Sequence, residues 1–170
     1  MDENTLFKKN VLVKLYILCL ILFLIALFTA YFYTDPASNV NNLNRNIRPD
    51  FFQIFFNNIK VASLLVFLGP LTLSLGTVAV LIINGLILGN AIGNIKDNLN
   101  LLLLVIPHGI IEVPVLLLAA SVGMKLTLDL LLLKINLKFT FKYIGIIFLG
   151  LMIAAMLETF LTPIFIKGAS

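Results

Sequence analysis

Charged residues are scarce in this chain. Only 12% of its 170 residues are Asp, Glu, Lys or Arg, whereas ordinary soluble domains have about 25%. The hydrophobic share is 61%, and the mean hydropathy is +1.09. A soluble domain near this length leaves about 30% of its unfolded surface exposed to water, so it could not hide this much apolar surface. The sequence therefore predicts one membrane domain, residues 1–170.

Three other residue types are absent or nearly so, and each shortage excludes something. Tryptophan is missing, so an aromatic belt at the membrane surfaces would have to use tyrosines. The single cysteine, Cys19, excludes a disulfide within the chain. The single histidine, His108, is too few for the usual catalytic zinc site, and no serine has the context of a catalytic nucleophile. We predict no cofactor, no metal and no enzymatic activity.

Long apolar runs predict an all-α bundle of about five transmembrane helices. The first run is not followed by a small-residue cleavage site, which favours a span over a signal peptide. Residues 51–93 would make one helix of about 64 Å, twice the membrane core, so Gly69-Pro70 is expected to break it. Asp50 can cap the second span. The predicted spans are residues 12–33, 51–69, 71–93, 107–123 and 143–166.

Two connecting segments differ in character. Residues 34–49 are rich in Asn and form a polar loop. Residues 124–142 are apolar but interrupted by Asp129 and Lys134, which predicts an interfacial helix lying along the bilayer. More lysines fall on the side of the N-terminus than on the other side. By the positive-inside rule, we expect a cytoplasmic N-terminus and an external C-terminus in the cell membrane.

Small residues and prolines suggest where the helices pack. Three glycines of the third span are spaced four apart, which places them on one helix face and favours close packing. A smooth wall for a ligand or a sliding partner is the alternative. Pro114 lacks an N–H, so the carbonyl of Ile110 loses its helical partner and a kink is expected. The residues assigned to packing are Gly85, Gly89, Gly93, Pro107, Gly109 and Pro114.

Polar side chains inside the spans carry most of the functional information, because a charge at the membrane centre costs at least about 2.5–3.5 kcal/mol. His108 and Glu112 are four residues apart and share a helix face. We interpret the polar group as a buried clasp between helices. A membrane-embedded site for a proton, a cation or a polar head group is one alternative, and a catalytic centre is another. The predicted cluster comprises Asn57, Asn58, Asn84, His108, Glu112 and Glu158.

Four strings in this order and spacing, FFQIFFNNIKVA, NGLILG, VIPHGIIEVP and AAMLETFLTP, resemble the stage II sporulation protein M family. The resemblance covers about residues 50–163 and implies a five-helix membrane protein. In spore-forming bacteria, it implies a scaffold that recruits cell-wall-degrading partners without cutting glycan itself. This chain resembles the short stand-alone branch. The motif maps onto Asn57, Asn58, Asn84, Gly85, Pro107, His108, Gly109, Glu112, Glu158 and Pro163.

Two functions follow from these patterns. The resemblance favours a non-enzymatic membrane scaffold or assembly factor. Its partners would be the lipid bilayer and other membrane or extracytoplasmic proteins. The buried His/Glu cluster beside a proline would also suit a small transporter or a subunit of an ion or proton path. Nucleic acid is not expected as a partner, since the basic residues are spread along the chain.

Overall fold

The computed structural model describes residues 3–36, 50–97 and 108–168. It contains five helices long and apolar enough to cross a membrane, and no strand within the described residues. The fold prediction is therefore confirmed, and the chain is a multi-pass membrane protein. In chain order the elements are α1 (Glu3–Tyr33), α2 (Phe51–Leu71), α3 (Leu75–Ile95), the short π-helix η2 (His108–Glu112), α5 (Val113–Leu131) and α6 (Leu137–Gly168).

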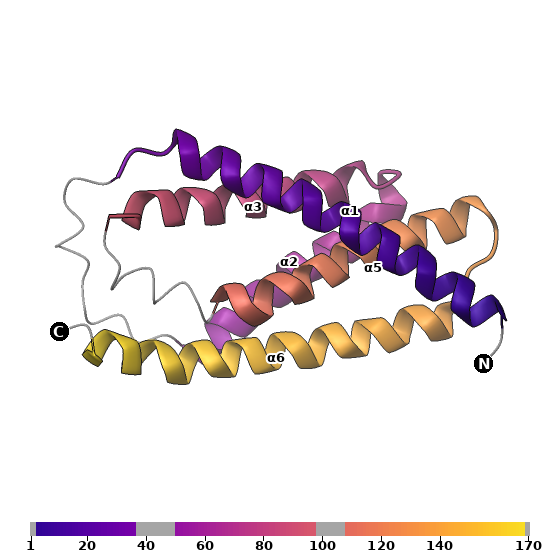
Figure 1. The fold of residues 1–170 in the computed structure, drawn as a ribbon. Helices are drawn as coiled ribbons and strands as arrows, with labels where there is room; N and C mark the ends of the chain where they lie inside the picture. The colour runs from indigo at the N-terminus through magenta and orange to yellow at the C-terminus, as the bar shows by residue number, and fades with distance from the viewer. Residues whose placement is uncertain (1–2, 37–49, 98–107, 169–170) are drawn as a thin grey trace.

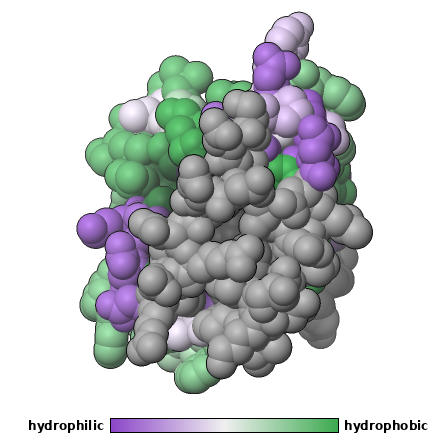
Figure 2. All heavy atoms as spheres, turned by 90° about the vertical axis from the view of Figure 1, so that its left-hand side faces the viewer, coloured by the Kyte–Doolittle hydropathy of each residue, from purple (hydrophilic) through white to green (hydrophobic). Residues whose placement is uncertain are grey.

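Successive helices run in opposite directions, so the two termini lie at opposite ends of the bundle (Figure 1). Helix α5 is the central one. In its apolar window 56% of the residues are buried, against 22–28% in the other four spans. It packs against α1, α2 and α6, while α1 also pairs with α3. An end-on view shows hydrophilic side chains in a few patches beside broad hydrophobic areas (Figure 2).

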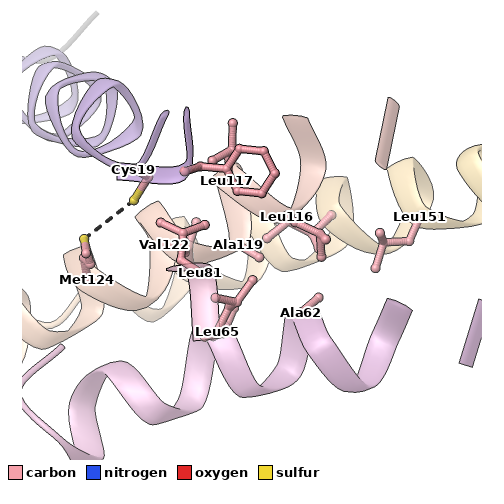
Figure 3. Close-up of a cluster of buried hydrophobic side chains, with 14 of the residues drawn as sticks. Cys19, Ala62, Leu65, Leu81, Leu116, Leu117, Ala119, Val122, Met124 and Leu151 are labelled. Carbon is pink, nitrogen blue, oxygen red and sulfur yellow. Dashed lines mark hydrogen bonds between the residues drawn. The ribbon is translucent and has the colours of Figure 1, made fainter. Parts of the chain in front are cut away.

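The core is a layer of aliphatic side chains around α5 (Figure 3). Leu65 of α2, Leu117 of α5 and Leu151 of α6 are almost fully buried there. On the α1 side, the buried Cys19 thiol donates a hydrogen bond to the sulfur of Met124 at 3.7 Å. Since lipid is as apolar as these side chains, the helices are held together by packing and polar contacts rather than by exclusion of water.

The α2–α3 hairpin is the tight turn expected near Gly69-Pro70, but it begins slightly later. Helix α2 includes Pro70 and ends at Leu71. The turn then uses a left-handed backbone at Leu73 and Ser74, with φ of 51° and 73°. At the other end of α2, the carboxylate of Asp50 accepts a hydrogen bond from the backbone N–H of Phe52 at 3.0 Å, so it caps the helix as the sequence indicates.

Residues 124–142 do not form a separate interfacial helix, so that prediction is corrected. Helix α5 continues to Leu131, and α6 begins at Leu137. The helix can continue because Lys125 pairs with Asp129 one turn later, which neutralises both charges inside the bundle. The side-chain oxygen of Asn136 accepts a hydrogen bond from the N–H of Phe139 at 3.0 Å and starts α6.

The three predicted packing glycines of α3 lie against α1 and the residue that follows it. A Cβ added at Gly85 would sit 2.8 Å from the carbonyl oxygen of Phe23, and one at Gly93 would sit 2.8 Å from Cβ of Thr34. A Cβ at Gly89 would meet the carbonyl oxygen of Leu27. A side chain at these positions would therefore push the two helices apart.

Gly109 and Pro114 do not have the packing role that the sequence suggested. Nothing lies within 4 Å of a Cβ added at Gly109, and Pro114 is exposed on the second residue of α5. Within the described residues, no neighbouring helix comes close to a side chain at Gly109, and Pro114 points outward, so neither residue is needed there for close approach. Pro107, the third member of that group, lies outside the described residues.

Candidate functional site

The clearest polar contact in the bundle joins α2 to the π-helix η2. The side-chain amide of Asn58 donates a hydrogen bond from Nδ2 to Oε2 of Glu112 over 2.6 Å. The two residues are only 4% and 3% exposed. Because α6 packs against both α2 and η2, three elements enclose the contact. We call this pair the clasp, since it links two helices that are 54 residues apart in sequence.

The π-helix explains how Glu112 is placed beside a proline. In an α-helix, the carbonyl of Ile110 would need the N–H of residue 114, which is a proline and has none. A π-helix instead bonds residue i to residue i+5, a pattern that passes over Pro114 to Val115. The predicted kink therefore takes the form of one wide turn over His108–Glu112, which ends at the carboxylate.

The other asparagines of the predicted cluster lie elsewhere, which corrects the six-residue grouping. Asn57 is exposed on the outer face of α2. Adjacent residues of a helix point about 100° apart, so Asn57 and Asn58 cannot both face one neighbour. Asn84 is half-buried, and its Nδ2 donates to the carbonyl of Val80 in its own helix at 2.8 Å. The amide of Asn84 therefore forms its hydrogen bond within α3 and takes no part in the clasp.

The two remaining members of the predicted cluster are placed only in part. Glu158 is half-buried on α6, the helix that packs against η2. His108 is the first residue of η2, four residues before Glu112, but its side chain lies outside the described part of the structure. The structure thus brings Asn58 and Glu112 together, and the membership of His108 and Glu158 in the cluster stays a prediction.

A second polar pair, an ion pair that sequence reasoning missed, lies near the other end of α5. The ammonium Nζ of Lys125 is 2.5 Å from Oδ2 of Asp129, and the two side chains are 4% and 15% exposed. Nζ also lies 4.7 Å from the ring centre of Phe139 on α6, a cation–π contact. The signal was present as a Lys and an Asp spaced four apart, but it lay in the segment that the sequence predicted to be an interfacial helix.

The chemistry available at these sites is limited. Within residues 3–36, 50–97 and 108–168, no group of three or more His, Cys, Asp or Glu side chains is arranged to hold a metal ion. The clasp offers a carboxylate and an amide that are already bonded to each other. A hollow on the surface between α2 and α6 is lined by apolar side chains and Ser63. These features favour holding helices together over binding a polar solute.

Comparison with known proteins decides the family. A family model described as stage II sporulation protein M matches residues 16–163. The chain belongs to the stage II sporulation protein M family. Within this family it is similar to an uncharacterised protein of Methanocaldococcus jannaschii, with 33% identity over 86% of this chain and 93% of the relative. No solved structure matches the chain. The matched residues include both the clasp and the Lys125–Asp129 pair.

Proposed function

We propose that this member of the stage II sporulation protein M family is a non-enzymatic scaffold or assembly factor of the cell membrane. The observation that carries the proposal is the closed clasp. Asn58 and Glu112 are buried, bonded to each other and enclosed by three elements. The polar groups are thus used to fix the helices. A rigid bundle with an apolar surface is suited to holding other membrane proteins.

The lysines support a proposed orientation. Exposed lysines gather at the end of the bundle that carries the start of α1, the end of α5 and the start of α6: Lys9, Lys14, Lys134, Lys138 and Lys142. By the positive-inside rule, this end would face the cytoplasm and the C-terminus would lie outside. A reporter that is active only in the cytoplasm should be inactive when fused to Ser170. Strong activity would reverse the orientation.

The scaffold proposal predicts stable partners. The tagged chain, solubilised from native membranes in a mild detergent, should copurify with membrane or extracytoplasmic proteins in fixed stoichiometry. A multi-pass protein of another family with the same tag is the matched control. Repeated isolation of the chain alone, at normal expression and in several mild detergents, would contradict the proposal.

A transport role is the second candidate, because Glu112 places a carboxyl group deep in the bundle on a π-helix beside a proline. If it is correct, proteoliposomes containing the chain should pass protons or small cations, and Glu112→Gln should abolish the flux. Equal flux with the wild type and the variant would remove Glu112 from any such path.

A further inference from the structure

One lysine of the bundle lies where a membrane tolerates lysine least. Lys60 is the tenth of the 21 residues of α2, and it is exposed. At 1.5 Å per residue, it is about 14 Å from the start of the helix, near the middle of a membrane core of roughly 30 Å. Lysine at a helix centre costs about 2.5–3.5 kcal/mol on insertion scales. This position therefore needs a physical reason.

Nothing in the described part of the chain compensates the Lys60 charge. Its ammonium has no ion pair or hydrogen bond there, in contrast to Lys125, which has both a carboxylate and an aromatic ring. The exposed lysines Lys14 and Lys142 lie near the ends of their spans, where a long side chain can extend its charge to the membrane surface. From the middle of α2, a lysine side chain is too short to do so.

Lys60 belongs to a row of exposed residues with helical spacing. Gln53, Asn57 and Lys60 follow one another at intervals of four and three, so they share one face of α2, and all three are exposed. The same face carries three large apolar residues: Phe56, Leu64 and Phe67, which are 56%, 48% and 60% exposed. We call these six residues the α2 stripe. Its three polar side chains offer several hydrogen-bond donors to whatever covers them.

The α2 stripe borders the hollow between α2 and α6. Phe67 belongs to both, and the hollow continues over Ala62 and Val66 to Ile147 and Leu151 of α6. Its lining is apolar apart from Ser63. An adjoining transmembrane helix could therefore set its own side chains into the hollow and present a polar group to Lys60, which is the usual combination of packing and polar contact between helices in lipid.

We propose that the α2 stripe docks a transmembrane helix of a partner protein that carries Asp or Glu near its middle. The proposal rests on the scaffold function and names the surface and the partner chemistry that the function would use. A carboxylate opposite Lys60 would neutralise a charge that otherwise faces hydrocarbon. A second copy packed through the same face would set Lys60 against Lys60, and lipid phosphates stay at the membrane surface, about 14 Å away.

The test uses the full chain in phosphatidylcholine vesicles and synthetic transmembrane peptides of leucine and alanine, with association followed by energy transfer between fluorophores. A peptide with a central Glu should bind the wild type at least tenfold more tightly than the same peptide with a central Leu. Lys60→Leu should abolish that preference. Lys142→Leu, the same change at an exposed lysine near a membrane surface, should leave the preference intact.

Two further variants separate charge from packing. Lys60→Glu should prefer a peptide with a central Lys, restoring binding with the charges exchanged. Phe67→Ala should weaken the binding of the Glu peptide and of the Leu peptide equally, because it removes part of the lining of the hollow. Phe28→Ala removes a similarly exposed ring from α1 and should change the binding of neither peptide. Thermal melting of each variant in detergent shows that the fold is intact.

Equal binding of the Glu and Leu peptides would overturn the proposal, and so would a preference for the Glu peptide that survives Lys60→Leu. A preference for the Glu peptide that disappears when phosphatidylglycerol is added would also overturn it, because Lys60 would then be binding lipid head groups. The scaffold function is judged separately by copurification. If partners copurify but the peptide preference does not depend on Lys60, only the docking proposal for the α2 stripe is refuted. A Lys60-dependent preference in a chain always purified alone would refute the scaffold function alone.

Discussion

The η2–α5 segment has a polar pair near each end, and the two pairs differ in where the partner side chain comes from. Glu112, at the start, accepts its hydrogen bond from another helix, α2. Lys125, near the end, has its carboxylate partner one turn further along the same helix. The first pair fixes the position of one helix against another. The second mainly allows α5 to bring a charged residue into the bundle, with the Phe139 ring as its contact to α6.

The two ends of the η2–α5 segment also differ in how closely the backbone approaches a neighbouring helix. Near Lys125, α5 touches α2 closely, because a Cβ added at Gly123 would meet the carbonyl oxygen of Leu65, and one at Gly69 would lie 2.5 Å from the carbonyl oxygen of Gly123. Near Glu112, a Cβ at Gly109 would meet nothing within 4 Å. At the Glu112 end, a side-chain hydrogen bond joins α2 to η2. At the Lys125 end, the backbones of α2 and α5 meet directly.

The largest effect is expected when Lys125 loses its partner. Asp129→Leu should lower the free energy of unfolding by about 3 kcal/mol, at the low end of the usual cost of an unpaired buried charge, since Phe139 still faces the ammonium. Unfolding titrations with a denaturing detergent would measure this. The double variant Lys125→Met/Asp129→Leu should recover most of the loss. A double variant as unstable as Asp129→Leu would contradict this account of the pair.

Gly123→Ala should destabilise the bundle by about 2–3 kcal/mol, the upper part of the overpacking range, because the obstructing atoms are α2 backbone and cannot rotate away. The same unfolding titration applies. A variant that melts like the wild type would show that α2 and α5 can separate freely at this end.

Glu112→Leu should cost about 1–3 kcal/mol, since it leaves the buried amide of Asn58 without its acceptor. Glu112→Gln should cost less, because the amide oxygen can still accept the bond. If Glu112→Gln were as destabilising as Glu112→Leu, the carboxylate charge rather than the hydrogen bond would hold the clasp.

The smallest effect is expected for Gly109→Ala, within about 0.5 kcal/mol of the wild type, because the added methyl group meets open space. Its comparison with Gly123→Ala isolates backbone packing, since the chemical change is identical. A loss similar to that of Gly123→Ala would mean that residues outside the described part cover this face.

The apolar runs of the sequence were enough to predict the helices, because lipid leaves the backbone few alternatives. They could not predict which of Asn57 and Asn58 faces inward, since that depends on the rotation of α2, which its contacts with α5 and α6 set. Glycine spacing did indicate the face of α3 that meets α1. It did not reveal that a side chain at Gly109 would meet open space, because one glycine without a regular row does not indicate which helix face packs against a neighbour.

The Lys125–Asp129 pair was missed for a related reason. Two charges in an apolar stretch are equally compatible with a helix on the membrane surface and with an internal pair. Only the continuation of α5 to Leu131 distinguishes them. Local spacing could have suggested the pair, but the burial of Lys125 depends on α6, whose Phe139 packs back over its ammonium.

The most direct test of the clasp is a double-mutant cycle on its two residues, with Asn58→Leu, Glu112→Leu and the double variant compared by free energy of unfolding. If the hydrogen bond joins α2 to η2, the single losses should not add, and the coupling energy should be about 1 kcal/mol or more. Strictly additive losses would mean that Asn58 and Glu112 act independently and that the clasp does not hold the bundle together.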